Sequence, residues 1–247
     1  MQRYDDQGFA VVRGVFAANE LEVIEAEVDH YLDEQIAAGE SRELILEATP
    51  GKAVRCAFGM DQRSVYFDAL MRDRRLYEVV RELWSDAEAL ADGTMLINKA
   101  PFSSYEFPWH QDNAYQFWSP PEAVALTLAL DDSSAESGAI VCLAGSHQQE
   151  ILPHRPSGVL GASRGLVEMP KDGKYPEVTL SLHPGDLSLH HVNTIHRTGP
   201  NRTSKNRRNL GFAYRSSRSL RNEAAMSQYE RDLKQFLDAP QRAPNAG

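Results

Sequence analysis

Two side chains that can bind a metal stand two positions apart in the segment PWHQDN, an imidazole at His110 and a carboxylate at Asp112. On an extended segment, residues i and i+2 project from the same face, so we expect both side chains to reach one point in space. Alone, such a pair also fits a hydrogen-bonded surface pair. A non-haem iron site for oxygen chemistry needs two histidines and one carboxylate on one face of the metal. A third ligand must therefore come from elsewhere in the chain.

One downstream stretch offers that ligand. It contains four histidines: His183, His190, His191 and His196. Only after the last of them does a hydroxyl follow at +2, Thr198, and an arginine at +11, Arg207. A guanidinium beside the metal suits a dicarboxylate, because its fork pairs with a carboxylate through two hydrogen bonds. In RRNLGFAY, Arg207 has the parity of the small residues and Arg208 that of the large ones, so we expect Arg207 to face a bound molecule.

The elements that must position these residues are mainly strands. From about residue 94, short apolar runs such as AVALTLAL, GAIVCLAG and RNLGFAYR alternate with Gly, Pro, Asn, Asp and Ser clusters. This pattern predicts a mainly β protein with flanking α-helices, of the sandwich or jelly-roll kind. We expect one domain over 1–247, with an N-terminal helical flank at about 1–93, a jelly-roll core at about 94–216 and a C-terminal helical tail at about 217–247.

The N-terminal flank carries two amphipathic patterns. Asn19 is the expected cap of a first helix, whose apolar stripe includes Leu21, Ile24 and Val28. A second helix is expected around 76–84. The polar insertion at 158–177 reads as a lid or binding loop.

Composition excludes several partners. The chain has 247 residues, a formal net charge of −9 and a pI of about 5.4, without a basic run that would suit nucleic acid or an anionic membrane. No apolar stretch is long enough to span a bilayer. The two cysteines, Cys56 and Cys142, lack a disulfide or metal-binding spacing and are expected to be core thiols. We therefore expect a cytoplasmic protein acting on a small molecule; the oligomeric state has no sequence signal.

Four ordered blocks resemble one family. PWHQD, LALDDSSAESGAIVCLAGSH, PGDLSLHH and HRTGPNRTSKNRR look like the phytanoyl-CoA dioxygenase family of Fe(II)/2-oxoglutarate oxygenases, over roughly residues 4 to 215. The resemblance implies a double-stranded β-helix, the cupin-like jelly roll, with iron held by His110, Asp112 and His196. It also implies that Arg207 and Thr198 bind 2-oxoglutarate, and that O₂ is the second cosubstrate.

Further assignments follow from the same resemblance. Thr127 would also face the cosubstrate, and Lys99 matches a basic residue before the metal-binding strand. His190 and His191 are rival ligands that lack the offsets of His196, and Arg202 is a weak rival to Arg207. Because the carboxylate is retained at position 112, hydroxylation of an unactivated C–H bond is favoured over halogenation, with conversion of 2-oxoglutarate to succinate and CO₂.

The substrate is expected to be a small polar or anionic metabolite. The residues that could contact it are Gln111, Asn113, Arg55, Tyr115 and Arg215, with Arg218 as a further basic side chain. Two other classes stay open on the same jelly roll: a non-oxygenase metal enzyme and a noncatalytic ligand-binding protein. The first would not need Arg207 and would not consume O₂, and the second would bind a ligand without turnover.

Overall fold

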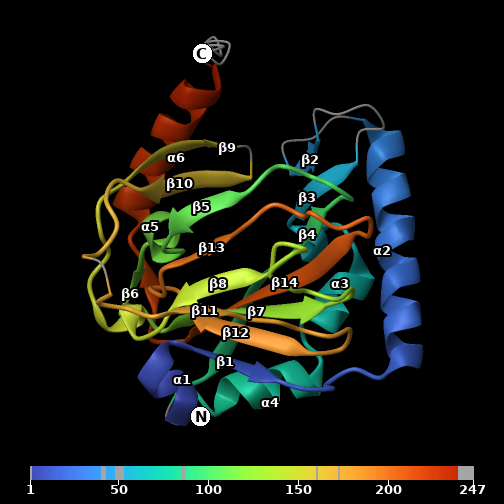
Figure 1. Cartoon of the computed structure of the whole chain (residues 1–247), viewed down its shortest axis with the longest axis horizontal. Helices are drawn as coiled ribbons and strands as arrows, with labels where there is room; N and C mark the ends of the chain where they lie inside the picture. Colours follow the sequence, from blue (N-terminus) through green and yellow to red (C-terminus); the bar gives the residue numbers. More distant parts are fainter. Residues whose placement is uncertain are drawn as a thin grey trace.

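Two antiparallel sheets form the body of the protein (Figure 1). The computed structural model describes residues 2–39, 43–47, 53–84, 87–159, 161–171 and 173–238. The large sheet contains, in spatial order, β1 (Phe9–Val12), β12 (Leu187–His191), β7 (Ala123–Ala129), β14 (Arg207–Ser216), β4 (Ala89–Lys99), β3 (Val54–Phe58) and β2 (Leu44–Leu46). The small sheet contains β11 (Glu177–Thr179), β8 (Ile140–Leu143), β13 (His196–Thr198) and β5 (Phe107–His110). The cupin-like jelly roll expected from the sequence is confirmed.

Helices and two short pairs of strands complete the fold. The helices are α1 (Gln2–Gln7), α2 (Ala18–Ala38), α3 (Val65–Leu70), α4 (Arg74–Arg81), α5 (Asn113–Gln116) and α6 (Glu223–Asp238), with 3₁₀ turns at Met60–Gln62 and Ser146–Gln148. β9 (His154–Val159) pairs with β10 (Ala162–Leu166), and β6 (Trp118–Ser119) pairs with β15 (Leu220–Arg221). Across the described ranges, no helix combines the length and apolar character needed to cross a bilayer.

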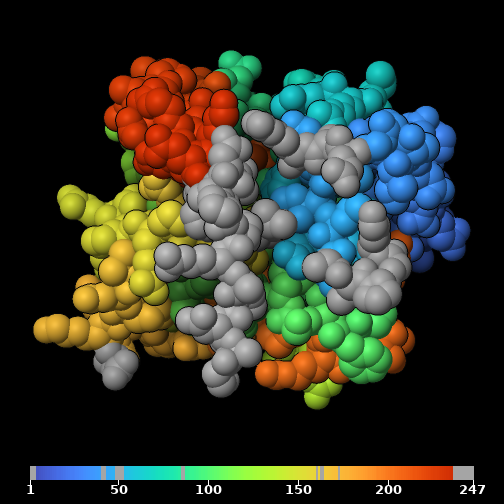
Figure 2. Space-filling model, turned by 90° about the horizontal axis from the view of Figure 1, so that it is seen from above, coloured from blue at the N-terminus to red at the C-terminus, as the bar shows by residue number. Residues whose placement is uncertain are grey.

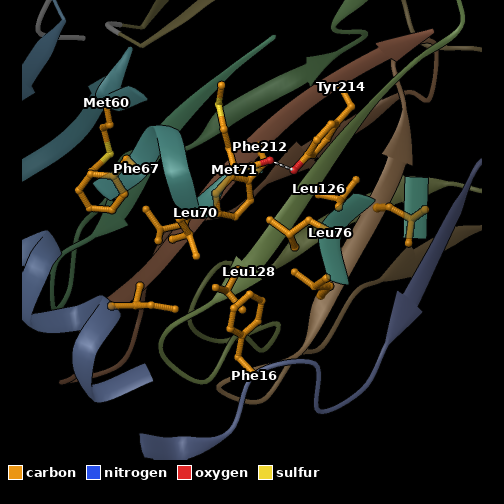
Figure 3. Packing of buried hydrophobic residues seen from close by; sticks show 14 of the residues in the cluster. Phe16, Met60, Phe67, Leu70, Met71, Leu76, Leu126, Leu128, Phe212 and Tyr214 are labelled. Carbon is orange, nitrogen blue, oxygen red and sulfur yellow. Dashed lines mark hydrogen bonds between the residues drawn. The ribbon is translucent and has the colours of Figure 1, made fainter. Parts of the chain in front are cut away.

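The main core fills the space between one face of the large sheet and the helices (Figure 3). Strand alternation sends Leu126, Leu128 and Phe212 to this face, where they meet side chains from α3 and α4. Tyr214 belongs to the same face, and its hydroxyl donates to the Met71 carbonyl at 2.6 Å. The opposite face of β7 and β14 therefore carries small and polar side chains, which point toward the small sheet.

The N-terminal flank is not wholly helical. β1, β2 and β3 all join the large sheet, and β4 already begins at Ala89, before the expected boundary near residue 94. The cap of α2 is Ala17 rather than Asn19, because Glu20 Oε2 reaches back to accept from the Ala17 amide at 2.9 Å. The apolar stripe of α2 is confirmed, since Leu21, Ile24 and Val28 are buried.

The insertion at 158–177 is more regular than a loop. Its first part forms the end of β9 and all of β10, a hairpin that packs against β5. In the view from above, this hairpin (yellow) and α6 (red) lie on one side of the molecule, while α2 and β2 (blue) lie on the other (Figure 2). The last residues of the expected C-terminal tail, 239–247, lie outside the described residues. The single-domain organisation stays a prediction.

Candidate active site

The pairing of β13 with β5 brings two imidazoles together. His196 stands opposite His110 in this antiparallel pair, and their ring centroids are 4.1 Å apart. Asp112 lies just beyond β5, with Oδ1 3.5 Å from His110 Nε2 and 3.7 Å from His196 Nε2. One potential ligand atom from each of the three residues lies within 4.8 Å of the others, and all three are buried. Two nitrogens and one carboxylate oxygen at these separations fit iron.

The backbone at Asp112 differs from the expectation. β5 ends at His110, and Asp112 adopts helical angles (φ −59°, ψ −36°) at the start of α5. The two side chains therefore converge through a strand-to-helix turn rather than along one extended face. The Asp112 carboxylate makes no capping hydrogen bond to α5, so it is not held by the backbone of that helix.

Backbone carbonyls fix the tautomers of both imidazoles. His110 Nδ1 lies 2.8 Å from the Pro108 carbonyl, and His196 Nδ1 lies 3.0 Å from the Thr194 carbonyl. A carbonyl can only accept, so each Nδ1 carries the proton and each Nε2 keeps a free lone pair. Both free nitrogens are the ones that face Asp112.

Electrostatics also favour the metal-binding protonation states. Burial lowers the pKa of His196 well below its ordinary value, and the neighbouring imidazoles of His110 and His190 lower it further. Burial would raise the pKa of Asp112, but the surrounding imidazoles, His196 foremost, lower that pKa well below its ordinary value. A neutral imidazole and an ionised carboxylate are the forms that bind a metal.

Two further side chains hold the Asp112 carboxylate. His190 Nε2 lies 3.2 Å from Oδ2, the oxygen that faces away from the imidazole pair, and the Tyr115 hydroxyl donates to Oδ1. The His190 ring is 4.2 Å from that of His196, so this rival ligand of the sequence analysis is a neighbour of the site. His191 instead packs near Tyr4 and His147.

Arg207 is a buried cation facing the same space. Its side chain is 1% exposed, and burial lowers its pKa. Nη2 donates to the Gly138 carbonyl at 3.0 Å, and the Asn209 amide, with its oxygen turned toward the guanidinium, accepts from Nη1 at 2.9 Å. Nε has no partner, and within the described ranges no carboxylate pairs with Arg207. The expected strand face is confirmed, since Arg208 lies on the other face and pairs with Asp131 at 2.9 Å.

The other residues expected near the cosubstrate divide into two groups. Thr198 and Thr127 are buried and line the same cavity, and Thr198 Oγ1 has no partner. Lys99 stands opposite Arg207 in the β14–β4 pair but lies outside the cavity lining. Its Nζ donates to the Tyr105 carbonyl at 2.9 Å and lies 3.9 Å from the centre of the Tyr105 ring.

Of the residues expected to contact substrate, Tyr115 alone lines the cavity. Gln111 is held elsewhere, because its amide donates to the Asn193 carbonyl and accepts from the Leu152 amide, both at 2.9 Å. Asn113 is occupied by the backbone of Trp118.

The basic candidates are also engaged elsewhere. The Arg55 guanidinium stacks 4.2 Å from the centre of the Tyr105 ring. Arg215 lies over Trp118, donates to the Ser219 carbonyl at 3.1 Å and lies 3.8 Å from Asp92. Arg218 pairs with Glu122 at 2.9 Å. None of these three lines the cavity.

The cavity itself has a volume of about 1170 Å³ and reaches from Arg207 past the metal-binding cluster to the hairpin β9–β10 and α6. Arg164 and Tyr229 line this outer part and were not expected from the sequence. In the sequence, the one indication that Arg164 could contact a ligand was its position in the insertion at 158–177, and Tyr229 had none.

Comparison with models of known protein families shows which family this chain belongs to. The model described as "Phytanoyl-CoA dioxygenase (PhyH)" matches residues 4–209. The chain belongs to this family. Membership confirms the resemblance stated above and makes the protein a 2-oxoglutarate-dependent dioxygenase, with iron as cofactor and 2-oxoglutarate as cosubstrate.

Named relatives of the phytanoyl-CoA dioxygenase family are distant. A probable alpha-ketoglutarate-dependent hypophosphite dioxygenase from Stutzerimonas stutzeri is 28% identical over 86% of this chain and 76% of its own length. The peroxisomal phytanoyl-CoA dioxygenase of Rattus norvegicus is 25% identical over 87% of this chain and 67% of its own length. Among solved structures, the non-heme alpha ketoglutarate dependent epimerase SnoN from nogalamycin biosynthesis aligns with a TM-score of 0.73 and 24% identity, over 100% of this chain and 93% of that one. This last likeness supports the fold.

Proposed function

We propose that the protein hydroxylates an unactivated C–H bond of a small polar or anionic molecule, with His110, Asp112 and His196 as the iron ligands. The ligand atoms are His110 Nε2, His196 Nε2 and Asp112 Oδ1, the three that face one another. When bound, iron and 2-oxoglutarate supply the oxidising chemistry. In the overall balance, one oxygen atom of O₂ enters the product hydroxyl, the other enters succinate, and CO₂ leaves.

Arg207 and Thr198 bind the distal carboxylate of 2-oxoglutarate in this proposal. The observation that carries it is a fully buried guanidinium that has no carboxylate partner among the described residues and keeps an unpartnered Nε, beside an unpartnered Thr198 Oγ1. A buried charge without a partner is strongly unfavourable, so such a group calls for an anionic ligand. Thr127 adds a hydroxyl to the same wall of the cavity.

The remaining residues prepare the site. The Pro108 and Thr194 carbonyls hold the two imidazoles in the tautomer that binds metal, while His190 and Tyr115 orient the Asp112 carboxylate. Lys99 pairs with Arg207 across β14 and β4 and supports this wall of the cosubstrate site without reaching the cavity, through its hydrogen bond to the Tyr105 carbonyl. All three ligand residues are buried, so the surrounding protein limits their contact with bulk water.

The test is the stoichiometry of O₂ consumption and succinate formation by the iron-loaded enzyme. Wild type is expected to form one succinate per O₂ from 2-oxoglutarate, and the rate is expected to fall at least about a hundredfold in His196→Ala. His183→Gln is the matched control, because His183 is exposed and pairs with Asp132. A non-oxygenase metal enzyme or a binding protein would consume no O₂, and that result would overturn the proposal.

A further inference from the structure

The cavity has one wall that the metal and cosubstrate do not use. This wall is built by α2, β2, β3 and β4, and the side chains that it presents are apolar. They are Ile36, Leu44, Ile45, Leu46, Phe58, Met95 and Ile97. Met95 and Ile97 come from the same face of β4, as strand alternation requires.

Such a wall restricts the substrate. The buried polar side chains that line the cavity gather at the metal-binding cluster and around Arg207, where the proposed iron and 2-oxoglutarate need them. A molecule that is polar all over would lose hydrogen bonds to water against the apolar wall, and the described residues of the wall offer no side-chain donor or acceptor in return. A molecule with an apolar body would gain from the same contact.

A basic side chain on β10 faces this space from the opposite side. Arg164 on β10 lines the cavity, and its Nη1 donates to the Ala114 carbonyl at 3.0 Å, two residues after Asp112. Its guanidinium lies 4.8 Å from the centre of the Tyr229 ring on α6. In the part of the chain that the structure describes, no carboxylate lies within ion-pair distance of Arg164.

The charges beside Arg164 do not neutralise it. Glu230 and Lys234 also line the cavity from α6, and they stand one helical turn apart with opposite charges. Among the described residues that line this side of the cavity, the formal charges of Glu230 and Lys234 cancel, and Arg164 leaves a net charge of about +1. A guanidinium held over an aromatic ring with unused N–H donors suits a carboxylate or another oxyanion.

We infer that the substrate is an organic anion with an apolar body, whose anionic group pairs with Arg164 while its apolar carbons lie against the wall formed by α2, β2, β3 and β4. This places an apolar C–H bond, rather than the anionic group, beside the metal-binding cluster. The reaction at that bond rests on the proposed function, whereas the binding preference does not.

The test is calorimetric titration of the metal-free protein with butanoate, hexanoate and octanoate, and with 1-octanol as the neutral counterpart. Because Arg207 could also attract a carboxylate, each titration is repeated in Arg207→Gln. In both proteins the affinity is expected to rise by up to about fourfold for each added methylene. An affinity that does not change from butanoate to octanoate would overturn the inference.

Two substitutions and a control separate the contribution of the anionic group to binding from that of the apolar body. Arg164→Gln is expected to lower the affinity for octanoate about tenfold and to change the affinity for 1-octanol by no more than about twofold. Leu46→Gln is expected to weaken both ligands. Arg155→Gln is the matched control, because Arg155 is exposed on the same hairpin and does not line the cavity. Equal binding of octanoate by wild type and Arg164→Gln would remove the anionic half of the inference.

The two proposals can fail separately. Chain-length dependence and Arg164 dependence without succinate formation would support the ligand class and contradict the oxygenase reaction. Succinate formation with tight binding of a short oxyanion such as methylphosphonate, and no gain from chain length, would support the reaction and overturn the ligand class.

Discussion

His190 Nε2 lies 3.2 Å from Asp112 Oδ2, while Oδ1 of the same carboxylate faces His110 and His196. The two oxygens of Asp112 thus have separate partners. His190 comes from β12 in the large sheet, whereas the other two histidines come from the small sheet, so this contact joins the two sheets at the proposed metal site.

Replacing His190 should weaken metal binding without removing a ligand. In His190→Phe the carboxylate loses its fixed orientation, and the affinity for Co(II) is expected to fall about 10- to 100-fold. His190→Gln keeps a donor and should recover part of the loss. Titration of Co(II) by its visible absorption spectrum measures both. A Co(II) affinity equal to wild type in His190→Phe, with the fold intact by circular dichroism, would mean that the contact does not orient the ligand.

Removing the Arg207 guanidinium should weaken the binding of 2-oxoglutarate but not that of the metal. Arg207→Gln loses charged hydrogen bonds of about 1.5–3 kcal/mol, so the Kd for 2-oxoglutarate is expected to rise about 10- to 100-fold. Metal affinity should stay within about twofold. Arg202→Gln is the control, because Arg202 is exposed in the neighbouring turn. A larger effect in Arg202→Gln than in Arg207→Gln would reverse the assignment.

Lys99 should make stability depend on pH. Burial, followed by Arg207, lowers its pKa from 10.5 to about 7. Between these values the unfolded chain binds more protons than the folded one, so the free energy of unfolding rises with pH; the penalty is complete below pH 7 and absent above pH 10.5. Wild type should therefore gain about 2 kcal/mol relative to Lys99→Met between about pH 7 and 9.

Urea unfolding of both proteins at several pH values in that window measures this difference. Lys205→Met serves as the reference, since Lys205 is exposed and its removal should leave the pH dependence as in wild type. Parallel stability curves for wild type and Lys99→Met would show that Lys99 keeps an ordinary pKa.

Residues on the core face of the large sheet should contribute to the stability of the fold and not to ligand binding. Tyr214→Phe leaves the buried Met71 carbonyl without its donor and is expected to lower the free energy of unfolding by about 1–3 kcal/mol. The affinity for 2-oxoglutarate should not change, because Tyr214 packs in the core (Figure 3), whereas Arg207 lines the cavity. A loss of 2-oxoglutarate affinity comparable to that of Arg207→Gln would contradict this separation of the two faces.

Local patterns predicted much of this arrangement. The alternation in RRNLGFAYR correctly placed Arg207 on the cavity side of β14 and Arg208 on the other, because a strand has a period of two. The spacing of His110 and Asp112 indicated that the two would converge, although the backbone between them is a turn into α5 rather than a strand.

Contacts that depend on long-range packing could not be predicted in the same way. His190 reaches Asp112 only because β12 of the large sheet lies behind the small sheet, and Arg164 reaches the cavity only because β9 and β10 fold over β5. Conversely, Gln111 and Arg55 have polar groups that could bind a ligand, but tertiary contacts with Leu152 and Tyr105 hold them outside the cavity.

The most direct test is an anaerobic titration of the metal-free protein with Fe(II) and 2-oxoglutarate, followed by visible absorption. Chelation of 2-oxoglutarate to iron gives a weak charge-transfer band. We expect this band in wild type and in His183→Gln, its loss in Asp112→Ala and His196→Ala, and its appearance only at higher 2-oxoglutarate concentration in Arg207→Gln. Wild-type protein with bound iron and no band, or an undiminished band in Asp112→Ala and His196→Ala, would contradict the proposed site.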